Sequence, residues 1–275
     1  MPSQFSAANL AVQLYTVRDF LNTEKEVAET FARIREIGYP AVQLSAVSAM
    51  NGENPEVDAK RAKQLLDDNG LKCIATHRSW EQLANTTEQE IEFHQTLGCD
   101  FTAIGSLPGG FGNKAGAETY STWAREAQPT IAKLKAAGIR FGYHNHAFEF
   151  ERVTRGENGG ARTFFDVLLE EGGEDLLFEI DVYWIDHAGA NAQRIIEKLT
   201  NRIPVIHIKD KEVVSNEPIM AAIGEGNLDW DNLLPALAAA GTEWIAVEQD
   251  TCSRDPFDSL KSSFEFLRNH ASFTK

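Results

Sequence analysis

Short apolar runs alternate along this chain with segments whose apolar residues recur every three or four positions. The short runs are rich in β-branched and aromatic residues and are typical of strands, whereas the longer spacing places apolar side chains on one face of a helix. Strands are predicted at residues 10–15, 39–44, 71–76, 99–104, 140–144, 176–180, 203–208 and 244–247. Helices are predicted at residues 24–37, 59–68, 88–97, 118–137, 163–169, 191–199, 228–239 and 256–267.

This alternation predicts an α/β protein, a (β/α)₈ TIM barrel that spans residues 1–275 as one domain. The strands are apolar throughout because both faces of a parallel sheet are covered. A doubly wound open sheet is the rival architecture. It is disfavoured because no predicted strand is followed directly by a glycine-rich phosphate-binding turn.

Four of the predicted strands carry polar residues at or just after their C-terminal ends. The run FGYHNHAFEF contains His144, His146 and Glu149, and three later apolar runs each finish on one polar residue. These segments are LLFEIDVYW with Asp181, IPVIHIKD with His207, and WIAVEQD with Glu248. Parallel α/β folds place their chemistry at the carboxyl ends of the strands. We therefore expect these strand ends to meet around one divalent metal ion.

Glu149, Asp181, His207 and Glu248 would form a mostly oxygen site. Such donors favour Mn²⁺, Mg²⁺ or Co²⁺, with Zn²⁺ as an alternative, since structural zinc sites prefer thiolate and imidazole. A metal ion held there can polarise a sugar carbonyl and acidify the adjacent C–H. Two carboxylates beside the sugar could then remove and return the proton, and Glu149 and Glu248 are the candidates for this catalytic pair.

Charge and cysteine content narrow the choice of partners. A formal charge of −15 and a pI near 4.9 argue against nucleic acid and anionic membranes, whose binding depends on cationic side chains. The cysteines are few and lack CxxC spacing, so we expect reduced thiols. Without a secretory segment or a long apolar stretch, we expect a cytoplasmic protein. The sequence leaves open whether the protein forms a homo-oligomer.

Five segments together resemble one known family. YHNHAFEF, EIDVYW, VIHIKD, GEGNLDW and IAVEQD are similar to motifs of the xylose-isomerase-like barrel superfamily of sugar and sugar phosphate isomerases and epimerases. The resemblance covers nearly the whole chain and is strongest over residues 141–250. It implies that a Glu, an Asp, a His and a second Glu from strands five to eight bind the metal, and that the two Glu residues act as acid and base. Asp181, His207 and Glu248 match this pattern by motif.

The ligand on the fifth strand has two candidates. Many relatives carry a Glu within the strand where this chain has His144 or Asn145, so His144 is an alternative catalytic or metal-binding residue. If the strand is regular, His144 and His146 share a face and Glu149 points away from it, so Glu149 needs a bulge or a loop to turn inward. We favour Glu149, because a second carboxylate explains proton transfer more simply.

Substrate contacts are expected from His77, His146, Trp184 and Lys209. Lys209 could bind a substrate oxygen or phosphate, or pair with Asp210. Trp184 stands where the family often has a substrate-binding His. An aromatic plane there could stack on a sugar ring or an aglycone, so the substrate could be larger than a monosaccharide.

The sequence thus predicts an enzyme, a metal-dependent sugar or sugar phosphate isomerase or epimerase with a small-molecule sugar as its partner. The alternative is a lyase on the same scaffold, either a keto-cyclitol dehydratase or a 3-keto-glycoside β-eliminase. A barrel that binds a sugar without catalysis is a third hypothesis.

Overall fold

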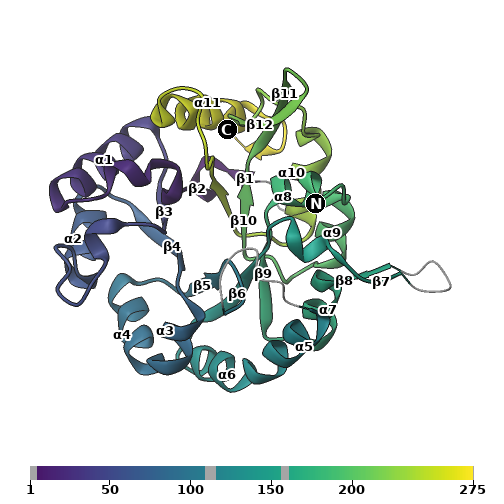
Figure 1. Cartoon of the computed structure of the whole chain (residues 1–275). Coiled ribbons are helices and arrows are strands. Elements are labelled where there is room, and N and C mark those ends of the chain that lie inside the picture. Colours follow the sequence, from purple (N-terminus) through teal and green to yellow (C-terminus); the bar gives the residue numbers. More distant parts are fainter. Residues whose placement is uncertain (1–4, 109–115, 156–160, 275) are drawn as a thin grey trace.

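Eight parallel strands form a barrel in the computed structural model, which describes residues 5–108, 116–155 and 161–274 (Figure 1). Neighbouring strands follow the order β10-β13-β2-β3-β4-β5-β6-β9. Their bounds are β2 Leu10–Gln13, β3 Ala41–Leu44, β4 Lys72–His77, β5 Phe101–Ile104, β6 Arg140–His144, β9 Leu176–Glu179, β10 Val205–Ile208 and β13 Trp244–Val247. Each strand predicted from the sequence overlaps one of these, so the predicted single-domain TIM barrel is confirmed.

The barrel is nearly closed, and its last junction lies between β9 and β10. These strands are joined by an isolated parallel bridge between Asp181 and His207, just beyond the end of β9. The backbone N–H of His207 donates to the carbonyl of Ile180 at 2.9 Å. The bridge sets Asp181 and His207 at the same level of the barrel wall.

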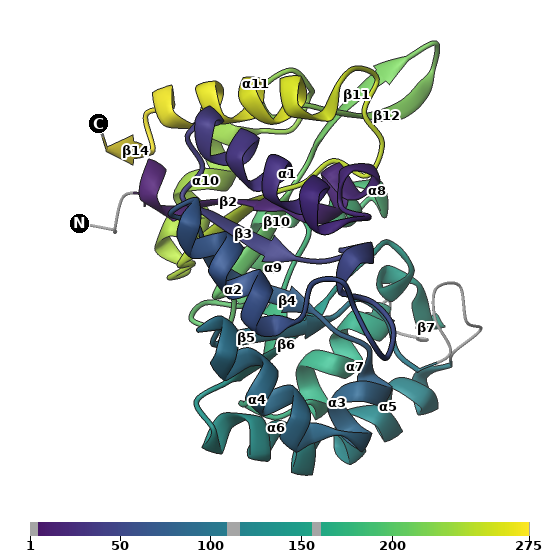
Figure 2. The ribbon, with the colours of Figure 1, turned by 90° about the vertical axis from the view of Figure 1, so that its left-hand side faces the viewer.

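Helices surround the strands on the outside (Figures 1 and 2). Their bounds are α1 Glu24–Ile37, α2 Ala59–Asp68, α3 Trp80–Asn85, α4 Thr87–Leu97, α5 Ala117–Glu126, α6 Gln128–Ala136, α7 Phe164–Glu171, α8 Val182–His187, α9 Ala192–Lys198, α10 Trp230–Ala239 and α11 Pro256–Asn269. The predicted helix at 118–137 is wrong as one element, because α5 and α6 meet at Ala127. Pro129, the second residue of α6, has no N–H to continue the hydrogen-bond ladder of α5. No helix in the described ranges is long and apolar enough to cross a membrane.

Several shorter elements lie outside the eight barrel strands. They are the 3₁₀ turns η1 Ala7–Asn9, η2 Leu14–Phe20, η3 Ser48–Met50 and η4 Phe148–Phe150, the strand pair β1 Phe5–Ser6 with β14 Phe273–Thr274, and the hairpins β7 Arg152–Arg155 with β8 Ala161–Thr163 and β11 Asp210–Val214 with β12 Glu217–Ala221. The β11–β12 hairpin directly follows β10 and projects beyond the barrel (Figure 2). Its tip therefore lies at the end of the barrel where the strands finish.

Alternate residues of the strands fill the barrel interior in two layers. The lower layer is an apolar cluster of Ala11, Ala41, Ile74, Ala75, Phe101, Ala103, Val205 and Ala246. Gly142 belongs to this level, where a Cβ would lie 2.5 Å from the ring of Phe101. Two residues further along the strands, the side chains become polar, because successive residues of a strand alternate between its faces. Gln13, Gln43, Glu179 and His207 are buried at this second level.

Candidate metal centre

Three side chains from neighbouring strand ends converge above the apolar layer. Asp181 follows β9, His207 lies within β10 and Glu248 follows β13. One ligand atom from each lies within 4.8 Å of the others, and all three residues are buried. The His207 Nδ1 atom is 2.9 Å from Glu248 Oε2. The structure therefore brings together three of the four residues that the sequence proposes as metal ligands.

The backbone around Asp181 fixes its carboxylate. Asp181 caps the N-terminus of α8, because its Oδ1 accepts from the backbone N–H of Trp184 at 3.2 Å. Its own N–H donates to Asn145 Oδ1 at 3.0 Å, which links the ends of β6 and β9. The second carboxylate oxygen, Oδ2, therefore faces the other two strand ends.

Lys209 is a buried cation beside this group. Its Nζ lies 2.7 Å from Asp181 Oδ2, 2.9 Å from Glu248 Oε2 and 3.2 Å from Asp250 Oδ2. Burial would lower the pKa of Lys209, but these carboxylates raise it, so the side chain is charged. Pairing of Lys209 with Asp210, the alternative considered from the sequence, does not occur. Asp210 accepts instead from backbone N–H groups of the loop before α10.

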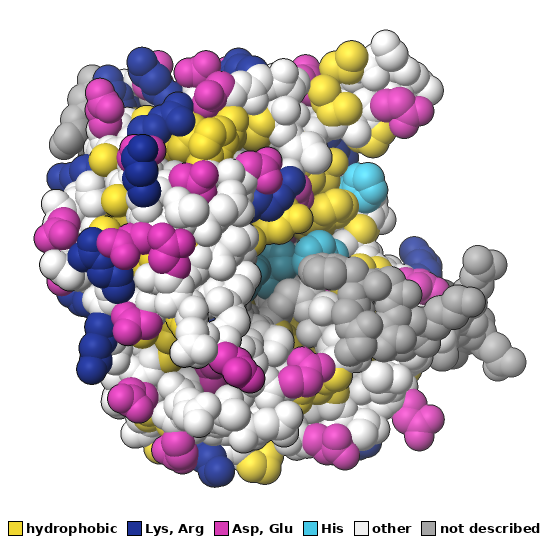
Figure 3. Space-filling view, turned by 60° about the vertical axis from the view of Figure 1, so that its left-hand side comes forward, with side chains coloured by type: hydrophobic (Ala, Val, Ile, Leu, Met, Phe, Trp, Pro, Cys, Tyr) yellow, Lys and Arg dark blue, Asp and Glu magenta, His cyan; other side chains and the backbone are white. Residues whose placement is uncertain are grey.

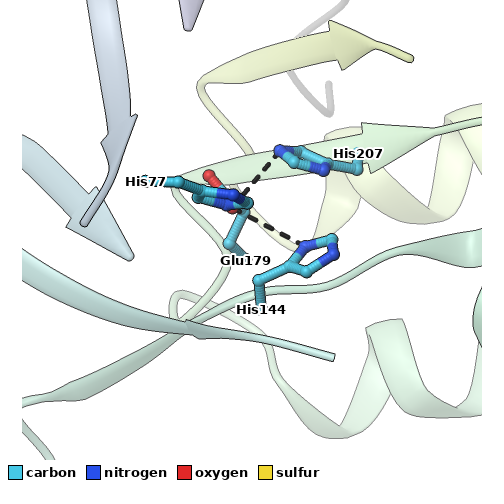
Figure 4. A group of neighbouring side chains, drawn as sticks. All are labelled: His77, His144, Glu179 and His207. Atoms are coloured by element: carbon cyan, nitrogen blue, oxygen red, sulfur yellow. Dashed lines mark hydrogen bonds and ion pairs between the residues drawn. The ribbon is translucent and has the colours of Figure 1, made fainter. Parts of the chain in front are cut away.

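A second group shares His207 with the first. Ligand atoms of His77, His144, Glu179 and His207 also lie within 4.8 Å of one another (Figure 4). Glu179 Oε2 contacts the Nε2 atom of His77, lies 3.2 Å from His207 Nε2 and lies 3.6 Å from His144 Nδ1. Burial would raise the pKa of Glu179, but His207 and His77 lower it to about 2. Glu179 is therefore an ionised carboxylate in the middle of three imidazoles.

Glu179 was missed from the sequence, although a signal for it exists. It lies two residues before Asp181, and the extended chain continues past the end of β9, so both side chains face the barrel interior. The same period places His207 and Lys209 on one face, and also Glu248 and Asp250. Extending the period-two rule backwards from each strand end would have identified Glu179.

The structure does not bring Glu149 to either group, which corrects the preference for it over His144. Strand β6 ends at His144 without the required bulge, and Glu149 lies in η4. The Glu149 side chain is fully buried, and it accepts from Tyr143 Oη at 2.7 Å and from the backbone N–H of His146 at 2.8 Å. Burial raises the pKa of Glu149 to about 7, although these hydrogen bonds oppose the rise.

A cavity of about 780 Å³ opens above the two groups. Figure 3 shows histidine side chains gathered in the hollow on this face. The residues proposed from the sequence to contact substrate, His77, His146, Trp184 and Lys209, all line it, together with His144 and Glu248. The rings of His146 and Trp184 lie 5.5 Å apart. Glu149 is absent from this lining.

The chemistry of the first group fits a divalent metal ion. Among the described residues, Asp181 Oδ2, His207 Nδ1 and Glu248 Oε2 are buried and make no hydrogen bond of acceptable geometry, although they form ion-pair contacts. Buried polar atoms in this state are rare unless a cation or ordered water completes them. Two carboxylate oxygens and one imidazole nitrogen are donors suited to Mn²⁺, Mg²⁺ or Co²⁺, with Zn²⁺ as an alternative. The buried cluster of histidines and carboxylates is therefore consistent with a metal site.

Solved structures share this fold at low sequence identity. A sugar phosphate isomerase/epimerase from Parabacteroides distasonis superposes with a TM-score of 0.77 and 20% identity, covering 98% of this chain and 97% of the other. A 3-keto-D-glucoside 4-epimerase from E. coli gives 0.65 and 15% over 95% and 99% of the two chains. A probable 3-DHS dehydratase from Bacillus anthracis gives 0.68 and 14% over 95% and 99%.

The family resemblance drawn from the motifs is confirmed by an independent comparison. No curated protein matches the sequence. A family model described as xylose isomerase-like TIM barrel matches residues 31–270, and the barrel found in the structure agrees with it. The chain belongs to the xylose isomerase-like TIM barrel family.

Proposed function

We propose that this protein is a divalent-metal-dependent isomerase or epimerase that acts on a sugar or sugar derivative by proton transfer next to a carbonyl. The observation that carries the proposal is the convergence of Asp181, His207 and Glu248, of which Glu248 also lines the cavity. Membership of a barrel family whose structural neighbours include isomerases and epimerases supports it.

Asp181, His207 and Glu248 would hold the metal ion, with Mn²⁺, Mg²⁺ or Co²⁺ favoured by the two carboxylates. When bound, a divalent ion supplies positive charge that polarises a carbonyl and acidifies the neighbouring C–H. Lys209 contributes a fixed positive charge that holds Asp181 and Glu248 in place. Coulomb attraction in this buried setting keeps both carboxylates oriented toward one point.

Glu248 and His144 are the groups we assign to proton transfer. Both line the cavity, which Glu149 does not. Burial and the neighbouring His207 lower the pKa of His144 well below its usual value, so the ring is neutral and able to accept a proton. The pKa of Glu248 is lowered by Lys209 and His207 despite its burial, so its carboxylate is ionised. A base must lie within reach of the proton that it removes, and both side chains border the cavity where the sugar would bind.

The experiment is a solvent-exchange assay with Glu248→Gln. With a 3-keto-D-glucoside as the probe, wild type should exchange a substrate C–H with deuterated solvent, and the variant should lose at least about 100-fold of that rate. Glu243→Gln is the matched control, because Glu243 precedes the same strand at its opposite end and pairs with Arg140. Full exchange by folded Glu248→Gln would rule out the role of Glu248.

A lyase is the second candidate, and the shape of the cavity favours it. A volume of about 780 Å³ is toward the upper end of the range of about 300–1,000 Å³ for sites that take drug-sized ligands, which exceed a monosaccharide in size. Trp184 and His146 form an aromatic wall where a leaving group could pack. A dehydratase shares the fold. Product analysis by NMR separates the two, because isomerisation conserves the mass of the substrate and elimination does not.

A further inference from the structure

A fully buried hydrogen-bonded chain of three polar side chains lies beneath the metal-site candidates. Gln43 from β3, Glu179 from β9 and His207 from β10 are each 0% exposed. The Gln43 Nε2 atom lies 2.9 Å from Glu179 Oε1. The Gln43 Oε1 atom lies 2.7 Å from His207 Nε2. These contacts connect a carboxylate to an imidazole through one amide.

Chemistry fixes the direction of every hydrogen bond in this chain. A carboxylate oxygen of Glu179 accepts, so the amide group that faces it must be the NH₂ of Gln43. The amide oxygen of Gln43 then faces His207, and an amide oxygen can only accept. His207 Nε2 must therefore carry the proton and donate it. Glu179 Oε2, 3.2 Å from the same nitrogen, is a second acceptor and requires the same proton.

The consequence appears on the opposite side of the imidazole ring. The Nε2 proton is kept by Gln43 and Glu179, so a metal ion can take only Nδ1 of this ring, and any second proton on Nδ1 leaves when the metal binds. Nδ1 is the atom that faces Glu248 Oε2 at 2.9 Å, on the side of Asp181. In the second group, a metal ion bound by His77, His144 and Glu179 would have to use His207 Nε2. That nitrogen already donates its proton to Gln43. The two groups therefore cannot both use His207 as a neutral ligand.

We propose that Glu179 is a positioning residue, which acts directly and through Gln43 to hold His207 in the tautomer whose Nδ1 faces Asp181 and Glu248, and is not itself a metal ligand. This inference rests on the proposed metal site of the preceding section. Histidine ligands commonly donate their other ring N–H to a carboxylate or carbonyl group, which fixes the ring and raises its basicity. Glu179 also contacts His77 Nε2, so one carboxylate orients one ligand and one side chain of the cavity wall.

The test uses the full chain labelled with ¹⁵N-histidine, loaded with Zn²⁺ as a diamagnetic probe. Long-range ¹H–¹⁵N spectra report which nitrogen of each ring binds metal and which carries a proton, and a His207→Asn sample assigns the signal. Competition with a chelator gives the Zn²⁺ dissociation constant. In wild type we expect His207 with metal on Nδ1 and a proton on Nε2.

Glu179→Gln should weaken Zn²⁺ binding by about 10- to 100-fold, which is the usual cost of removing such a partner. It should also give a second His207 tautomer, because the Gln43 amide is then free to turn over. Gln43→Met breaks the hydrogen-bonded chain from Glu179 to His207 at its middle residue. This variant tests the inference if Glu179→Gln does not fold. Glu149→Gln is the matched control, a buried carboxylate outside both groups, and should leave Zn²⁺ affinity unchanged.

Several outcomes would overturn the inference. Metal on His207 Nε2 in wild type would contradict it. So would complete loss of Zn²⁺ binding in a folded Glu179→Gln protein. Unchanged Zn²⁺ affinity and an unchanged His207 tautomer in both Glu179→Gln and Gln43→Met would contradict it as well. No Zn²⁺ binding by wild type would overturn it together with the proposed function. If wild type shows the expected spectrum and no sugar reacts, the proposed function fails and the positioning role stands.

Discussion

At the scale of single residues, Glu149 makes the stability of the protein depend on pH. Its pKa is raised by burial from the model-compound value of 4.5 to about 7 in the folded chain. Between these values the folded state holds a proton that the unfolded state has released. Stability is therefore fully present below about pH 4.5 and is lost as pH rises through 7, by about 3 kcal/mol in total.

We expect Glu149→Gln to remove this dependence. The free energy of unfolding of the variant, minus that of wild type, should increase by about 2 to 3 kcal/mol between pH 5 and pH 8, because only wild type must ionise a buried carboxyl. Urea unfolding at a series of pH values measures the difference. Glu151→Gln, at an exposed neighbouring position, should give a curve parallel to wild type. A difference that is flat across this range would contradict the raised pKa.

The candidate site was predictable where strand ends and motifs coincide. Asp181, His207 and Glu248 could be found because each closes an apolar run, and the strands of a parallel barrel finish at one end. Glu149 could not be placed, because its position depends on the chain turning into η4 after His144, which no local pattern indicates. Glu179 was hidden within an apolar run, where a charge is costly unless histidines from other strands surround it.

At the scale of elements, Asp210 ties the end of β10 to the start of α10. Its carboxylate accepts from the backbone N–H groups of Gly224 at 2.8 Å, Gly226 at 3.1 Å and Leu228 at 3.2 Å. The indole N–H of Trp230, the first residue of α10, donates to it at 2.7 Å. One fully buried side chain therefore organises the loop between β12 and α10.

Removing the Asp210 carboxylate should strongly lower the free energy of unfolding. Asp210→Ala leaves several donors without an acceptor, each costing about 1–3 kcal/mol if it stays buried, so we expect a loss of at least about 3 kcal/mol. Urea unfolding gives the value. The control is Asp229→Ala, which removes only the N-cap of α10 and should cost about 1 kcal/mol. Equal losses in the two variants would show that Asp210 does not organise the loop.

Elements with local start and stop signals were predictable from the sequence, and the others were not. Helix α1 runs over the predicted residues, since Thr23 caps its start and Gly38, at φ 123°, ends it. Helix α8 was missed because its six residues are too few to establish a helical period. The β11–β12 hairpin was missed too. It turns at Ser215 and Asn216, which adopt positive φ without a glycine to mark the turn.

At the scale of the whole molecule, closure of the barrel and assembly of the metal-site candidates are one event. The bridge that joins β9 to β10 pairs Asp181 with His207, so these candidate ligands become neighbours only when the last strands meet. Ligands brought together by folding cannot bind a metal ion tightly in the unfolded chain. A metal ion bound at this site would then stabilise the folded barrel by mass action.

The charge of the whole molecule bears on which sugar the proposed enzyme would bind. The chain carries a formal charge of −15. Among the described residues, the lysine and arginine that line the cavity are both paired: Arg78 Nε lies 2.7 Å from Glu90, and Lys209 contacts Asp181, Glu248 and Asp250. No cation of the described lining is left for a phosphate group. If the cavity binds a sugar as proposed, we expect it to favour an uncharged sugar over a sugar phosphate.

We therefore expect methyl 3-keto-D-glucoside to bind at least about tenfold more tightly than its 6-phosphate, because like charges repel across a partly desolvated cavity. Titration calorimetry of both ligands at two salt concentrations measures the ratio, which should shrink as salt screens the repulsion. Glu90→Gln leaves the guanidinium of Arg78 without a charged partner. This variant should bind the 6-phosphate more tightly than wild type does, which lowers the ratio of the two affinities. Tighter binding of the phosphate by wild type would show that the cavity recognises a charged sugar, and the paired cations would then have to separate on binding.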